Sequence, residues 1–145
     1  LNDEEVGEAG MNAAFAGMHG VPVVLAAGDS AFAAEIQGFL DAETVVTKTS
    51  VTPAAARLRH PELVRADLRA AVGRALDGLE AGRMSPWDVG TPVRVAMRFT
   101  SPTHIAILQS IPGMSQVDGY TAAYTARNAD EAYRLIRLMY RFIRQ

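Results

Sequence analysis

Two polar side chains near the start of the chain are spaced so that they could form one site on a helix. Glu8 and Asn12 lie four residues apart, so on a helix they share one face. The residues around them are mostly small, in the stretch "GEAGMNAAFAG". A carboxylate pressed into such a place needs a partner, because an unpaired buried charge is very costly. A metal ion or an arginine could be that partner; alternatively, Glu8 faces solvent on an amphipathic helix.

Two further charged residues stand at the ends of predicted strands. Asp29 follows the apolar run "VPVVLAA", and Lys48 lies near the end of the next strand. Ligands of open parallel sheets bind at the carboxyl ends of the strands, where a lysine could hold a carboxylate or a phosphate. Each residue also has a structural interpretation. Asp29 is a good N-cap for the following helix, and Lys48 would be solvated at a strand end.

The remaining chemistry of the chain excludes several classes of site. His19, His60 and His104 have no second histidine or carboxylate at metal-ligand spacing, and neither His-Glu-x-x-His nor Gly-x-Ser-x-Gly occurs. With no cysteine, disulfides and thiolate metal sites are excluded. The net charge is -2, no basic run could follow a phosphate backbone, and no apolar run could span a bilayer. We therefore expect neither nucleic acid nor a membrane as a partner.

The elements that position these residues alternate between helix and strand. A helix is predicted over about residues 3–18, capped by Asn2 or Asp3 and ended by Gly20. Strands over 21–27 and 44–49 flank a second helix that starts at Asp29 or Ser30. This order predicts a right-handed βαβ unit, and the continuous apolar run predicts a parallel strand buried on both faces.

A long helix and a linker follow the βαβ unit, and the pattern changes after the linker. Pro53 and Pro61 each fit the first turn of a helix, and one apolar stripe at helical spacing follows, formed by Val64, Leu68, Val72, Ala75, Leu76 and Leu79. A linker is predicted over 83–92, followed by strand, helix, strand and helix. The predicted fold class is α/β, with a βαβ core of buried parallel strands in residues 1–84 and a small α+β (β-α-β-α) lobe in residues 91–145.

The stretch "VGEAGMNAAFAGMHGVPVVLAAGD" resembles the zinc D-aminopeptidases of the DppA type, peptidase family M55. These carry a Gly-Glu-hydrophobic-Gly-hydrophobic-Asn-Ala element, then a Val-Pro-Val strand ending in Gly-Asp. The resemblance continues through "VVTKTSVTPAAARLRHPE" and "SIPGMSQVDGYTAAYTARNADEAYRLI", and so covers the chain from end to end. It implies that Glu8 is a zinc ligand. Asn12, Asp29 and Lys48 match recurrent positions of the family, and we take them as candidate substrate-binding residues.

The resemblance also implies a function. It predicts a cytoplasmic, zinc-dependent aminopeptidase that removes N-terminal D-amino acids, such as D-Ala, from short peptides and forms ring-like homo-oligomers. The family's chain is roughly twice as long, and its other metal ligands and its catalytic histidine precede the segment that begins at Leu1. We therefore expect the C-terminal portion of such an enzyme, inactive alone and associated with the N-terminal half of the same protein. The alternative is a non-catalytic α/β binding or assembly module.

Overall fold

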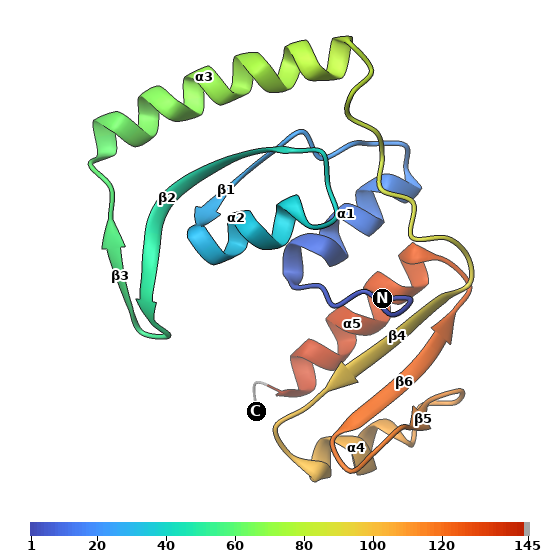
Figure 1. Ribbon diagram of the computed structural model, residues 1–145. Helices are drawn as coiled ribbons and strands as arrows, with labels where there is room; N and C mark the ends of the chain where they lie inside the picture. Colours follow the sequence, from blue (N-terminus) through green and yellow to red (C-terminus); the bar gives the residue numbers. More distant parts are fainter. Residues whose placement is uncertain (144–145) are drawn as a thin grey trace. The chain divides into compact units, whose positions relative to one another are not determined.

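Contacts between residues divide the chain into two compact units (Figure 1). The structure, a computed structural model, describes residues 1–143. Unit 1 combines residues 1–18 with residue 88 onward, and unit 2 contains residues 19–87. The sequence alone grouped the first 18 residues with those up to 84, whereas their contacts group them with the C-terminal segment.

The sheet of unit 1 is antiparallel, with the strand order β4-β6-β5. Strand β4 (Val93–Arg98) pairs with β6 (Thr121–Ala126), which also pairs with the two-residue β5 (Ser115–Gln116). Helix α4 (Pro102–Leu108) follows β4, and α5 (Ala129–Ile143) follows β6. The predicted β-α-β-α order is therefore confirmed, with β5 as an addition that the sequence pattern did not indicate.

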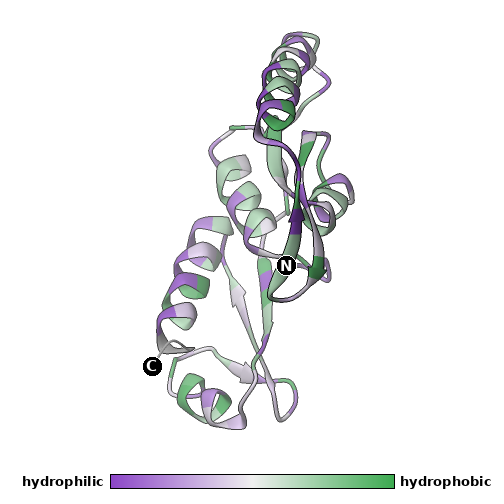
Figure 2. Ribbon diagram, turned by 90° about the vertical axis from the view of Figure 1, so that its left-hand side faces the viewer, coloured by the Kyte–Doolittle hydropathy of each residue, from purple (hydrophilic) through white to green (hydrophobic). Residues whose placement is uncertain are grey.

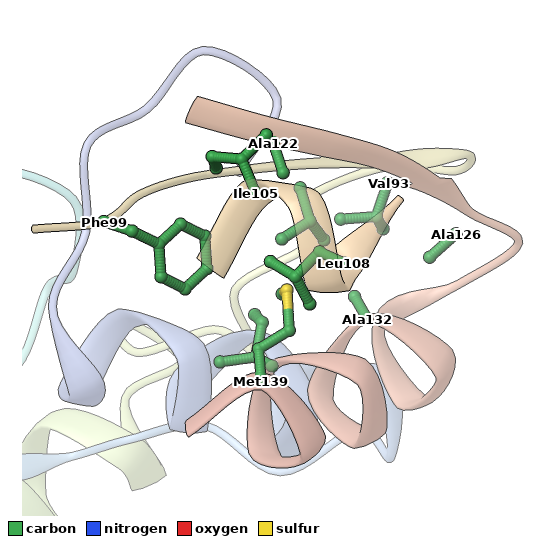
Figure 3. Close-up of a cluster of buried hydrophobic side chains, with 10 residues drawn as sticks. Val93, Phe99, Ile105, Leu108, Ala122, Ala126, Ala132 and Met139 are labelled. Atoms are coloured by element: carbon green, nitrogen blue, oxygen red, sulfur yellow. The ribbon is translucent and has the colours of Figure 1, made fainter. Parts of the chain in front are cut away.

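The hydrophobic core of unit 1 lies between this sheet, α4 and α5 (Figure 3). Val93 and Val95 point inward from β4, while the intervening Arg94 is exposed, as the alternating pattern predicts. Bulky and small residues fill the core together: Val93, Val95, Phe99, Ile105, Leu108, Ala122, Ala126, Ala132, Ile136 and Met139.

The N-terminal segment is tied to β4 before the first helix begins. Asn2 Oδ1 accepts a hydrogen bond from the Arg94 amide at 2.6 Å, and the Asn2 amide donates to the Arg94 carbonyl at 2.9 Å. Asn2 and Asp3 have φ values of 47° and 73°, a region that Asn and Asp tolerate better than most residues. The predicted helix start at these residues is wrong, because they form a turn along β4 instead. Helix α1 (Glu8–Met18) begins later.

Helix α1 contacts α5, and the residues that α1 buries are small. Its buried residues are Gly10, Ala13 and Ala14. A Cβ added at Gly10 would lie 2.5 Å from Val6 Cβ, so this position has no room for a side chain. Gly20, with φ at 72°, follows the helix where the sequence predicts its end.

Unit 2 contains the predicted βαβ unit. Strand β1 (Leu25–Asp29) runs parallel to β2 (Glu43–Thr52), and α2 (Ser30–Gln37) connects them. Strand β2 then turns back into β3 (Ala55–Leu58), with which it forms an antiparallel hairpin. Pro53 lies in the hairpin turn, so the prediction of a helix start there is wrong. Pro61 does open a helix, α3 (Pro61–Glu80).

Burial in unit 2 is lower than the sequence pattern predicts. The residues of β1 are half-buried except Ala27, which is exposed, so the expected burial on both faces is not found within this chain. The buried residues of α3 are Ala71, Ala75 and Gly78, while Val72, Leu76 and Leu79 of the predicted stripe stay exposed. Across residues 1–143, no helix combines the length and apolarity required to cross a membrane.

Two neighbouring residues of α5 test the core of unit 1. Met139 is 2% exposed and Leu138 is 44% exposed. We expect Met139→Ala to lower the free energy of unfolding by about 2–5 kcal/mol, because it removes buried volume and leaves a cavity. Leu138→Ala should change it by about 0.5 kcal/mol or less. Urea denaturation measures both, and equal losses in the two variants would contradict this core.

Candidate functional site

Glu8 and Asn12 line a pocket between α1 and α5 in unit 1. Glu8 stands in the first turn of α1 and Asn12 follows one turn later, so the four-residue spacing brings both side chains to the same pocket. Both residues are exposed within this chain. The pocket has a volume of about 290 Å³ and is lined by Glu8, Met11, Asn12, Tyr133, Ile136, Arg137, Tyr140 and Arg141.

The opposite wall of the pocket is formed by α5, with residues that the sequence reasoning did not select. Along α5, Arg137 follows Tyr133 by four residues, and Tyr140 and Arg141 follow Arg137 by three and four residues. This spacing places the four side chains along one side of the helix. Figure 2 shows both hydrophilic and hydrophobic residues around this helix. The spacing of these side chains is the signal that could have identified the second wall.

Aromatic contacts hold this wall in place. The Tyr133 ring stacks on Phe15 of α1 with 4.5 Å between ring centroids. The Arg137 guanidinium carbon lies 5.7 Å from the centroid of the same tyrosine ring, within the range of a cation–π contact. Phe15, Tyr133 and Arg137 therefore form a continuous stack from α1 to the pocket wall.

The charged residues of α5 divide into two groups. Arg134 pairs with Asp130 at 2.9 Å, and Arg127, just before the helix, pairs with Glu131 at 3.0 Å. Within the described part of the chain, the ion pairs include neither Arg137 nor Arg141, and they do not include Glu8. The pocket thus brings together two guanidinium groups and one carboxylate with no ion pair between them.

A metal site cannot be completed from residues 1–143. Within this range, no three His, Asp or Glu side chains lie together in a way that could hold a metal ion. The three histidines lie in separate parts of the chain. His60 Nδ1 accepts a hydrogen bond from the Glu62 amide at the start of α3. His104, in α4, lies against the ring of Phe99, and His19 follows the end of α1. Glu8 is therefore a single candidate ligand.

Asp29 and Lys48 come together in unit 2. They are partners in the parallel ladder between β1 and β2, next to an irregularity in register at Gly28. Asp29 caps α2: its Oδ1 accepts from the Phe32 amide and its Oδ2 from the Ser50 hydroxyl, each at 2.8 Å. These two hydrogen bonds, the amide first, lower the pKa of Asp29. The capping interpretation of Asp29 is confirmed, and Lys48 is exposed beside it.

The comparisons with known proteins agree with one another. A family model, Peptidase_M55, described as D-aminopeptidase, matches residues 1–138. Among solved structures, the chain is similar to the Zn-dependent D-aminopeptidase DppA from Bacillus subtilis, described as a self-compartmentalizing protease, with a TM-score of 0.91 and 25% identity. The similarity covers 99% of this chain and 53% of that chain, so this chain spans about half the length of that protein. No curated protein matches the chain.

The capping bonds of Asp29 predict a pH dependence of stability. Because the pKa of Asp29 is lower in the folded state, its charge stabilises the fold above the unfolded-state pKa. This stabilisation is lost as the pH falls through the folded-state pKa. We therefore expect Asp29→Ala to have a lower melting temperature than the wild type between about pH 5 and pH 7. The difference in melting temperature should shrink as the pH falls toward about pH 3.

Two matched variants make this experiment specific. Asp29→Asn keeps an N-cap side chain without a titrating charge, so it should retain part of the stability with a weaker pH dependence. Asp41→Ala removes a carboxylate from an exposed position and should have little effect. A pH-independent loss in Asp29→Ala would show that the charge of Asp29 does not stabilise α2.

Proposed function

The chain belongs to peptidase family M55, the D-aminopeptidases, and from this membership we propose that it is the C-terminal portion of a zinc-dependent D-aminopeptidase. Such an enzyme would release N-terminal D-amino acids, D-Ala among them, from short peptides. The observation that carries the proposal is the position of Glu8. It lies in the family's Gly-Glu-x-Gly-x-Asn-Ala element and lines an open pocket beside Asn12.

The chemistry of Glu8 fits a role as one zinc ligand. Its carboxylate is exposed at the pocket and belongs to no ion pair among the described residues, so an oxygen is available for a metal. Catalytic zinc sites use about three protein ligands, drawn from His, Cys, Asp and Glu, and leave one position open. The other ligands would therefore come from residues outside this chain. Bound zinc supplies the means to activate a water at neutral pH.

The other proposed site residues would bind and orient the peptide. The Asn12 amide can both donate to and accept from a peptide backbone, one helical turn from Glu8. Asp29 uses both carboxylate oxygens in hydrogen bonds within unit 2, so its proposed contribution is to hold the start of α2. Lys48 is exposed and has a donor to offer to a substrate oxygen.

We also propose assembly into a homo-oligomer in the cytoplasm. The description of the Bacillus subtilis protein as self-compartmentalizing supports the assembly. Unit 2 leaves several large apolar side chains exposed. In the β2–β3 hairpin, Val51 is 63% exposed and Leu58 is 76% exposed. Burial of such side chains favours association. The rival function is a non-catalytic α/β binding or assembly module, which the single candidate ligand would also fit.

Substitution of Glu8 tests the zinc proposal. In the longer protein that combines this chain with an N-terminal half, we expect Glu8→Ala to lower zinc affinity and the hydrolysis of D-Ala-D-Ala together, each by more than about tenfold. Zinc content is measured by mass spectrometry of the purified protein. Glu62→Ala, at an exposed position of α3, is the matched control and should retain both. Normal zinc content and normal turnover in Glu8→Ala would refute the assignment.

The 145-residue chain itself tests the rival function. We expect it to show no hydrolysis of D-Ala-D-Ala in the presence of zinc, because one carboxylate cannot complete a catalytic site. Addition of the N-terminal half should produce activity, detected by release of D-Ala. If both halves together bind each other but remain inactive, the non-catalytic module is the better description. Activity of the chain alone would contradict the ligand argument.

A further inference from the structure

The two walls of the pocket between α1 and α5 differ in charge. The α1 wall carries the Glu8 carboxylate and the Asn12 amide, and the α5 wall carries the Arg137 and Arg141 guanidinium groups. The tyrosines of α5 line the same pocket. Two cations against one anion leave the pocket with a positive charge, and the guanidinium donors lie on the wall opposite the carboxylate. The pocket therefore has an anion-binding side within a site of mixed charge.

The guanidinium groups are available for a ligand. The other arginines near them on the chain are already used: Arg134 pairs with Asp130, and Arg127 pairs with Glu131. Arg137 and Arg141 take part in no ion pair in the part of the chain that the structure describes. A second hollow of about 280 Å³ on α5 is lined by Arg134, Arg137, Leu138 and Arg141, so Arg137 and Arg141 border this hollow as well.

Arg137 is also positioned before a ligand arrives. Its guanidinium lies over the Tyr133 ring, which in turn stacks on Phe15. A side chain held in this way loses less rotamer freedom on binding. Arginine presents a planar fork of donors that matches a carboxylate with two parallel hydrogen bonds, and such charge-assisted pairs are stronger than neutral ones.

We propose that Arg137 and Arg141 form a subsite for the C-terminal carboxylate of a short peptide. The identity of the ligand rests on the proposed function, and the assignment of the cationic wall rests on the pocket. A volume of about 290 Å³ is at the lower end of small-molecule sites, which span about 300–1,000 Å³. A peptide that reaches from Glu8 to the arginine wall is therefore short, and a free carboxylate would be part of what the enzyme recognises.

Binding to the zinc-free 145-residue chain tests this subsite without catalysis. The probes are D-Ala-D-Ala and its C-terminal amide, which differ in the carboxylate, and dissociation constants are measured by NMR titration. We expect the acid to bind at least about tenfold more tightly than the amide. Arg137→Gln and Arg141→Gln should each weaken the acid by several-fold, and the double variant should bind acid and amide equally. Arg137→Lys keeps the charge without the fork and should be intermediate.

A control variant separates this subsite from a general charge effect. Arg134→Gln removes the same charge from the same helix at an arginine that does not line the pocket. It should bind the acid as the wild type does. All the substituted residues are exposed, and a urea unfolding curve for each variant verifies that it is folded.

Three outcomes would overturn the subsite. These are equal binding of acid and amide to the wild type, an equal loss in Arg134→Gln, and no binding of the acid at millimolar concentrations. None of them bears on zinc or turnover, so the peptidase proposal would stand. Conversely, if Glu8→Ala keeps normal zinc content and turnover, the zinc assignment is refuted. The wild-type chain can still bind the acid more tightly than the amide through the arginine wall.

Discussion

The close packing of α1 on α5 is the constraint on which the pocket depends. The contacts with α5 come from the side of α1 that carries Asn12 and Phe15. Gly10, Ala13 and Ala14 are buried on another side of the helix, where Val6 leaves no space for a Cβ at Gly10. Phe15 then reaches Tyr133, and the Met18 sulfur accepts a hydrogen bond from the Asp130 amide at 3.3 Å. These contacts bring Glu8 and Asn12 of α1 into one pocket with the side chains of α5.

This packing joins the two ends of the described chain, and further contacts hold both ends on the same sheet. The side chain and the backbone of Asn2 form hydrogen bonds with β4, and α5 packs on β4 and β6. The bonds fix the direction in which the chain enters α1. Glu8 therefore has a defined place at the pocket although its side chain is exposed and makes no ion pair among the described residues.

Local patterns predicted the parts of the fold that local physics determines. Asp29 caps α2 and Pro61 opens α3 because both roles depend on a few neighbouring backbone groups. Pro53 misled the prediction, since proline fits a turn between strands as well as a first helical turn. The meeting of α1 with α5 could not be predicted locally, because the residues that line the pocket from the two helices are more than one hundred positions apart.

The exposure of Glu8 explains why the sequence left its role open. A carboxylate in water has no desolvation cost, so it needs no partner, and the spacing of a surface glutamate and of a metal ligand can be the same. Glu8 would need a partner only if another segment covered the pocket and removed water from it. A metal ion and the arginines of α5 would then compete as partners for the same carboxylate. If zinc takes Glu8, Arg137 and Arg141 are left to balance a different anion, and a substrate carboxylate brings one.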